Sequence, residues 1–234
     1  LDVFLSNLDI LIREAIKLMK KLLITLLVVC LLPISRVQAL DNDVTPNAKS
    51  AILIEANSRQ ILYDKNAEEK LYPASTTKIM TMILMFEALR NKKISFDDEI
   101  TTSKYAASMG GSQVYLEVGE SLSLKDMFKS IAIASANDAS VAVAEHIAGS
   151  INKFVEMMND KAKKLGLKNT HFKNATGLHD PDHYTCAHDL AIMAAYLIEI
   201  GGEDLFAVTS LYDSYIREDT KQSFWLVNTN KLLK

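Results

Sequence analysis

The sequence has few cysteines and little net charge, and both shortages restrict what the chain can be. Only two of its 234 residues are cysteine, and the formal net charge is -3. With 49% hydrophobic and 24% charged residues, the composition excludes a disordered chain and gives no sign of a nucleic-acid partner. Internal repeats and low-complexity segments are also lacking. What remains is an ordinary globular protein.

Long apolar runs are scarce as well. The run at residues 22–32 is too short for a comfortable membrane span. Lys20 and Lys21 precede it, and a small-residue cleavage site ending at Ala39 follows it. This order is typical of a secretory signal peptide, so we predict one at residues 19–39 and an exported chain, with an uncleaved anchor as the alternative.

Cleavage after Ala39 would leave residues 40–234 as the mature chain. The removed part holds two more basic than acidic residues, so the mature net charge is -5. Cys186 would be the only remaining cysteine, which excludes an intrachain disulfide, and the core must hold by packing alone. Residues 1–18 precede the first methionine and are treated as an upstream extension. Cys30 is rejected as a lipoprotein site because bulky Val29 precedes it.

Hydrophobic periodicity predicts strands near both ends of the mature chain and helices between them. Strands are expected at residues 51–56, 60–63, 99–102, 214–217 and 224–227. Helices are expected at residues 75–89, 124–134, 137–148, 151–165 and 187–200. Side-chain caps are expected at Ser123, at Asn137 or Asp138, at Ser150 and at Thr185. This order predicts an α+β fold with a helical lobe inserted between two parts of one sheet.

Ser75 and Lys78 stand at the start of the most apolar predicted helix. Pro73 disfavours helix at Tyr72, so the helix begins at or just after Ala74, with Ser75 in its first turn. Lys78 follows three residues later on the same face. An alcohol beside an amine, near unpaired backbone N–H groups, predicts a nucleophile and its base. The alternative is a helix cap and a solvated amine.

Two other segments carry residue types that could be mistaken for a site. Ser150 and Lys153 repeat the Ser-x-x-Lys spacing, but they are interpreted as an N-cap and a solvated face. Residues 179–189 are rich in His, Asp and Cys, yet they lack a recognised metal-binding frame. We interpret them as a turn and a helix start, and predict no metal and no cofactor.

Further motifs favour chemistry at Ser75. Ser135-Ala136-Asn137 lies between two predicted helices, sixty residues after Ser75. With residues 51–63, 73–78, 111–112, 174–178 and 182–185, these motifs make residues 48–231 resemble the low-molecular-mass penicillin-binding proteins, which are serine-type D-alanyl-D-alanine carboxypeptidases. Ala136 stands where the motif set of the wider group has Asp. Lys-Thr-Gly, the third motif of that group, is absent, so the chain resembles a C-terminally truncated member that lacks the last sheet strands.

The resemblance implies a β-lactamase/transpeptidase-like fold and acyl transfer on a peptidoglycan stem peptide that ends in D-Ala-D-Ala. Ser75 would be the nucleophile and Lys78 the base, provided that its amine is neutral. Ser135 would relay a proton, and Asn137 would orient Lys78 and the substrate amide. β-Lactams would be inhibitors. The expected location is the periplasm or the outer face of the cytoplasmic membrane of a bacterium, with membrane association through a missing C-terminal anchor.

The missing motif also bears on activity. The backbone N–H of Ser75 would supply half of an oxyanion hole, and in the family the other half comes from the absent strand. Losing one such donor costs on the order of a hundredfold in rate. Lowering the pKa of Lys78 to about 7 would need burial and a second cation, for which the absent motif lysine is the candidate. We therefore expect this chain to be inactive or nearly so.

Three rival interpretations stay open. A class A β-lactamase needs a glutamate for deacylation, and residues 161–178 contain neither Asp nor Glu, which favours the carboxypeptidase. A non-catalytic peptidoglycan-binding or β-lactam-sensing protein on the same fold is the second rival. The third is a structural cell-wall protein with an accidental Ser-x-x-Lys.

Overall fold

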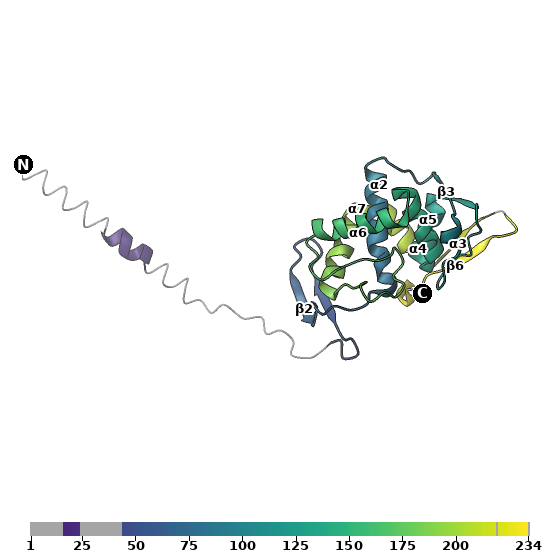
Figure 1. The fold of residues 1–234 in the computed structure, drawn as a ribbon. Helices are drawn as coiled ribbons and strands as arrows, with labels where there is room; N and C mark the ends of the chain where they lie inside the picture. The colour runs from purple at the N-terminus through teal and green to yellow at the C-terminus, as the bar shows by residue number, and fades with distance from the viewer. Residues whose placement is uncertain (1–15, 24–43, 219, 234) are drawn as a thin grey trace, which may run out of the picture. The chain divides into compact units, whose positions relative to one another are not determined.

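The computed structural model describes residues 16–23, 44–218 and 220–233 (Figure 1). The chain divides into two units, Leu1–Val44 and Thr45–Lys234. In the first unit, residues 16–23 form a helix. The predicted signal peptide and the upstream extension lie largely outside the described residues. Nowhere in the described chain does a helix combine the length and the apolar character that crossing a bilayer requires.

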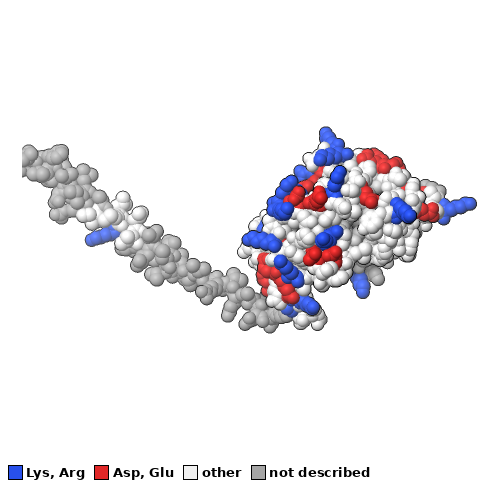
Figure 2. Space-filling model, viewed as in Figure 1, with Lys and Arg blue, Asp and Glu red and all other residues white. Residues whose placement is uncertain are grey.

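The second unit contains every strand and helix that the sequence predicts, and several short elements besides. Its elements are, in order, β1 (Ala51–Ile54), β2 (Ile61–Lys65), η1 (Ala74–Thr77), α2 (Lys78–Arg90), β3 (Glu99–Thr101), α3 (Lys104–Ala107), β4 (Ser121–Ser123), α4 (Leu124–Ala134), α5 (Asn137–Ala148), α6 (Ile151–Lys164), α7 (Ala187–Thr209), β5 (Asp213–Ile216), β6 (Phe224–Val227) and η2 (Lys231–Leu233). On the face that Figure 2 shows, basic and acidic side chains are interspersed.

The strands form three separate antiparallel pairs, β1–β2, β3–β4 and β5–β6. The prediction that the last two strands belong to the same sheet as the first two is therefore wrong for the described residues. Ile216 and Leu226 are fully buried, whereas Tyr215 and Trp225 on the other face of the hairpin are exposed. The buried face of β5–β6 packs on α4. This packing explains why buried and exposed residues alternate along the two strands without any further strand beside them.

Helix α2 occupies the centre of the helical part. It contacts α5, α6 and α7, and Figure 1 shows it running among them. Met80, Ile83 and Met85 lie on different sides of α2, and all three are fully buried. Contact with neighbours on several sides explains why its sequence has no polar face. The start of α2 is consequently held in place from several directions.

The predicted N-caps Ser123 and Ser150 are confirmed, since their hydroxyl oxygens accept hydrogen bonds from the backbone N–H groups of Asp126 and Lys153. The predicted cap of α5 is wrong. Ala136 occupies that position and offers no side-chain hydrogen bond.

Helix α7 departs from the prediction at its N-terminus. Its N-cap is Cys186, whose sulfur accepts from the backbone N–H of Asp189, while the hydroxyl of the predicted cap Thr185 pairs with that of Thr170. The helix expected at residues 187–200 is confirmed. Gly202, with a non-helical φ of 47° and ψ of -135°, makes a kink between it and a further helical segment that ends at Thr209.

Candidate active site

Ser75 lies in a tight turn at the head of α2. The turn is the 3₁₀ helix η1, and it confirms that the helical chain begins at Ala74. Ala74 has a φ of 47°, which is strained for a residue with a β-carbon. The hydroxyl of Thr76 donates to the carbonyl of Pro73 at 2.7 Å and ties the turn to the preceding chain. Ser75 itself is exposed in this turn.

Lys78 reaches back to Ser75, as the sequence predicts. Its Nζ lies 3.2 Å from Ser75 Oγ and donates a second hydrogen bond to the carbonyl of Thr176 at 2.9 Å. Only 3% of Lys78 is exposed, and this burial lowers the pKa of its amine to about 8. At pH 7, roughly a tenth of such amines are neutral, against a few in ten thousand at an ordinary lysine pKa. The pair thus has the geometry and the titration of a nucleophile with its base.

Residues 174–178 form a wall against this turn. The side-chain oxygen of Asn174 accepts from the backbone N–H groups of Thr176 and Gly177, which folds the segment tightly. Gly177 has a φ of +87°, and a β-carbon there would stand 1.7 Å from the carbonyl oxygen of Ala74. Glycine is therefore required at this position. The sequence pointed to these residues through resemblance only, without showing what they contact.

His183 supports the turn from its buried side. Its Nδ1 accepts from the backbone N–H of Lys173 at 3.2 Å, and its Nε2 lies 2.8 Å from the hydroxyl of Thr77. Because a backbone N–H can only donate, the ring proton belongs on Nε2, which donates to Thr77. Burial lowers the pKa of His183 to about 4, so its ring is neutral at pH 7. In the described chain, no three His, Cys, Asp or Glu side chains are grouped to hold a metal ion.

Asn137 begins α5 and is 95% buried, with 5% exposed. Its side-chain NH₂ donates to the carbonyl of Gly110 and its backbone N–H to the carbonyl of Ser112, both at 2.7 Å. Its Oδ1 is buried and has no hydrogen-bond partner among the described residues.

The expected contact between Asn137 and Lys78 is not formed. The side-chain NH₂ of Asn137 donates to the carbonyl of Gly110 instead. The amine of Lys78 forms its hydrogen bonds with the hydroxyl of Ser75 and the carbonyl of Thr176. Ser135 is half-buried and ends α4 in a left-handed conformation, with a φ of 58°. Within the described chain, no hydrogen bond joins Ser135 to Ser75 or Lys78. Helices α2 and α5 do contact each other, and this packing is what relates the two motifs.

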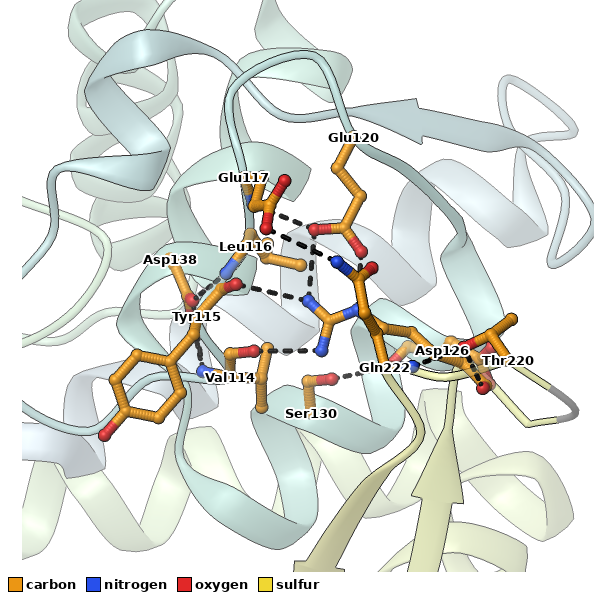
Figure 3. A network of polar contacts seen from close by, with 11 residues as sticks. Val114, Tyr115, Leu116, Glu117, Glu120, Asp126, Ser130, Asp138, Thr220 and Gln222 are labelled. Atoms are coloured by element: carbon orange, nitrogen blue, oxygen red, sulfur yellow. Dashed lines mark hydrogen bonds and ion pairs between the residues drawn. The ribbon is translucent and has the colours of Figure 1, made fainter.

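Asp138 is a site residue that the sequence analysis treated only as a candidate cap. It is fully buried, and its carboxylate accepts from the backbone N–H groups of Val114 and Leu116 (Figure 3). It also accepts from the backbone N–H of Ala139. It thereby fixes the loop whose carbonyls hold its neighbour Asn137. A charged residue directly before the mostly apolar stretch at residues 139–144 was the signal that could have identified it.

Volume alone does not locate this site. A hollow of about 580 Å³ lies near the other end of α2, where Arg90 and Lys93 line it, and Ser75 is not among its lining residues. Chemistry concentrates instead at the head of α2, where the exposed hydroxyl of Ser75 and the buried amine of Lys78 lie together. These are the groups that acyl transfer through a serine requires.

Comparison with known proteins agrees with this chemistry. The family model for D-alanyl-D-alanine carboxypeptidase matches residues 36–234. The D-alanyl-D-alanine carboxypeptidase DacF of Bacillus subtilis is 55% identical over 193 residues, which cover 82% of this chain and 49% of that protein. DacC of Escherichia coli, another D-alanyl-D-alanine carboxypeptidase, is 40% identical over 158 residues, or 65% of this chain and 40% of that one. The chain thus spans about half the length of these relatives or less.

The fold is similar to that of solved structures as well. Penicillin binding protein 5 from Haemophilus influenzae has a TM-score of 0.73 and 34% sequence identity, covering 80% of this chain and 53% of that chain. Penicillin binding protein 6B from Escherichia coli has the same TM-score at 33% identity. These likenesses confirm the predicted α+β fold of the transpeptidase type.

Proposed function

Because the chain belongs to the D-alanyl-D-alanine carboxypeptidase family, we propose that it performs acyl transfer with Ser75 as the nucleophile. Ser75 Oγ attacks the carbonyl between the two terminal D-alanines of a peptidoglycan stem peptide. The C–N bond breaks, the last D-alanine leaves, and water then releases the acyl group from Ser75. The observation that carries this proposal is the buried amine of Lys78, 3.2 Å from Ser75 Oγ.

The proton movements follow from the environment of each group. Neutral Lys78 accepts the proton of Ser75 as the hydroxyl attacks, and its lowered pKa supports this role. Protonated Lys78 returns this proton through the hydroxyl of Ser135, which relays it to the leaving amine. Asn137 orients the substrate amide. The backbone N–H of Ser75 stabilises the oxyanion that forms on the carbonyl.

β-Lactams follow the first half of the same reaction. Their cyclic amide acylates Ser75, and the opened ring stays attached to the protein. The stem peptide and β-lactams are thus the proposed partners, and no metal, cofactor or nucleic acid is invoked. The proposed location is outside the cytoplasmic membrane of a bacterium, which the signal-peptide pattern at residues 19–39 supports. Attachment through a C-terminal membrane anchor belongs to the same proposal.

The sequence contains no Lys-Thr-Gly, so the second oxyanion donor and the second cation are not supplied by these 234 residues. We expect this chain to be acylated on the order of a hundredfold more slowly than a family member that carries the motif.

Intact-mass spectrometry after incubation with a fluorescent penicillin tests the proposal. We expect a slow adduct that maps to Ser75 and is abolished by Ser75→Ala. The matched control is Ser150→Ala, which removes the serine of the other Ser-x-x-Lys and should leave labelling unchanged. A folded chain that gains no adduct, yet binds a D-Ala-D-Ala peptide, would favour the non-catalytic function. Rapid stoichiometric labelling would contradict the expected loss of rate.

A further inference from the structure

Arg217 follows β5 directly and inserts its guanidinium into a loop distant in sequence. Only 8% of its side chain is exposed. Nε and Nη2 donate to the two carboxylate oxygens of Glu120 at 2.5 and 3.1 Å. Nη1 donates to the carbonyl of Val114 at 3.1 Å, and Nη2 also reaches the carbonyl of Tyr115 at 3.3 Å. One side chain therefore holds one carboxylate and two backbone carbonyls of the same loop.

The carboxylate in this cluster remains charged. Burial alone would raise the pKa of Glu120, but hydrogen bonds from Arg217 and from the backbone N–H of Glu117 keep it below its ordinary value. Charge-assisted, two-pronged contacts of this kind are stronger and more directional than those a lysine makes.

The same loop is held from its other side by Asp138. Val114 donates its backbone N–H to the Asp138 carboxylate and accepts a hydrogen bond from Arg217 at its carbonyl (Figure 3). A negative and a positive side chain therefore hold the N–H and the carbonyl of the same residue. Asn137, the neighbour of Asp138, binds the carbonyls of Gly110 and Ser112 in the same loop. The backbone of residues 110–120 therefore connects Arg217 to Asn137, with hydrogen bonds from each of these two residues to the loop.

Strained backbone conformations occur in the loop, near Asn137 and at Arg217 itself. Tyr115, Ser135 and Arg217 have φ values of 56°, 58° and 55°, in the left-handed region that residues with a β-carbon avoid. Each such conformation persists only where the surrounding contacts determine it. A cavity of about 180 Å³ beside the guanidinium also gives the loop room to move if the contacts are lost.

We propose that Arg217 is a positioning residue for acyl transfer. It clamps residues 110–120 against the start of α5, and this loop in turn fixes the backbone N–H and the side-chain amide of Asn137. Through this clamp, the hairpin β5–β6 contributes to a site that none of its residues is proposed to touch. The inference rests on the proposed role of Asn137 in binding the substrate.

Hydrogen exchange of the Asn137 backbone N–H, followed by NMR on the full chain, tests the clamp without needing turnover. Arg217→Lys keeps the charge but cannot hold both carbonyls and Glu120 together. We expect the Asn137 amide to exchange about tenfold faster or more in this variant, while amides in the middle of α6 keep their rates. The control is Lys161→Met, which removes the ion pair of Lys161 with Glu87 elsewhere on α2. In Lys161→Met, the exchange rate of the Asn137 backbone N–H should change no more than the rates of other buried backbone amides do.

An unchanged Asn137 exchange rate in Arg217→Lys, or a rise no larger than that of the α2 core amides, would overturn the clamp. Acylation by penicillin gives a second readout. Arg217→Lys should lower the maximal acylation rate more than Lys161→Met does at matched thermal stability. Absence of any adduct on the unsubstituted chain would count against the proposed function, whereas the exchange measurement would still decide on Arg217.

Discussion

Gly177 and Ala74 approach each other so closely that a β-carbon on Gly177 would stand 1.7 Å from the Ala74 carbonyl oxygen. This contact joins the wall at residues 174–178 to the turn that carries Ser75. The adjacent carbonyl of Thr176 is the second acceptor for the Lys78 amine. The wall thus fixes the position of Ser75, the proposed nucleophile, and the orientation of Lys78, its proposed base.

Gly177→Ala should be strongly destabilising and should abolish acylation of Ser75. The steric clash and the positive φ together are expected to lower the free energy of unfolding by about 3 kcal/mol or more. Gly166→Ala is the matched control, because Gly166 also has a positive φ, +74°, but nothing within 4 Å of a β-carbon. It should lose only about 1 kcal/mol. Urea unfolding of both variants measures the difference, and equal losses would exclude the close contact.

Lys78→Met should abolish acylation while making the fold more stable at pH 7. The pKa of Lys78 is about 8 in the folded state against 10.5 normally, so below pH 8 the protein carries a buried ammonium. This penalty amounts to at most about 3 kcal/mol and disappears as pH rises from 8 to 10.5, where the unfolded chain still binds the proton. We therefore expect the unsubstituted chain, but not Lys78→Met, to gain stability over that range.

Lys153→Met, the corresponding change at the other Ser-x-x-Lys, provides the control for Lys78→Met. Lys153 is exposed, so its substitution should alter neither labelling nor the pH dependence. A Lys78→Met variant that is less stable than the unsubstituted chain at pH 7 would show that the hydrogen bonds of the amine outweigh its burial.

Acid should weaken the fold through His183. The pKa of this residue is lowered by burial to about 4 from 6.5, so its contribution is complete above pH 6.5 and is lost as pH falls towards 4. The loss is at most about 3 kcal/mol. His183→Gln should be less stable at pH 7 but should lack this part of the acid dependence. His179→Gln, at an exposed position of the same loop, should retain it when both are unfolded in urea between pH 4 and 7.

Asp138→Asn should loosen the loop that holds Asn137. The carboxylate accepts three backbone hydrogen bonds, and an amide presents an NH₂ group to at least one of these donors. The expected loss is about 2 to 4 kcal/mol, with slower acylation. Asp126→Asn, at a partly exposed position of α4, should change stability by less than about 1 kcal/mol. Comparable melting temperatures for the two variants would contradict the role of Asp138.

The features that the sequence predicted are those decided by neighbouring residues. Pro73 and the apolar run after Lys78 were enough to place the start of α2, and Ser123 and Ser150 cap their helices with hydroxyls that act locally. The contact of Lys78 with Ser75 spans only three residues. Chemistry at this spacing is visible in the sequence because the helix itself brings the two groups together.

Long-range contacts account for the errors. Asn137 and Asp138 are good cap residues, but partners at positions 110–116 engage their side chains. Thr176, the second hydrogen-bond partner of Lys78, lies 98 residues away in the sequence. His183, which is hydrogen-bonded to Thr77, lies 106 residues away from it. Among the described residues, β5 and β6 pair only with each other and pack on α4. Periodicity could not predict this, because alternating apolar residues show which face of a strand is buried but not which strand lies beside it.

The central claim is that burial gives Lys78 a substantial neutral fraction beside Ser75 at physiological pH. NMR titration of the Lys78 Cε and Nζ signals between pH 6 and 11, assigned by their absence in Lys78→Met, measures this directly. The structure predicts a midpoint near pH 8. A midpoint near the ordinary lysine value of about 10.4 would leave Ser75 without its base and contradict the mechanism.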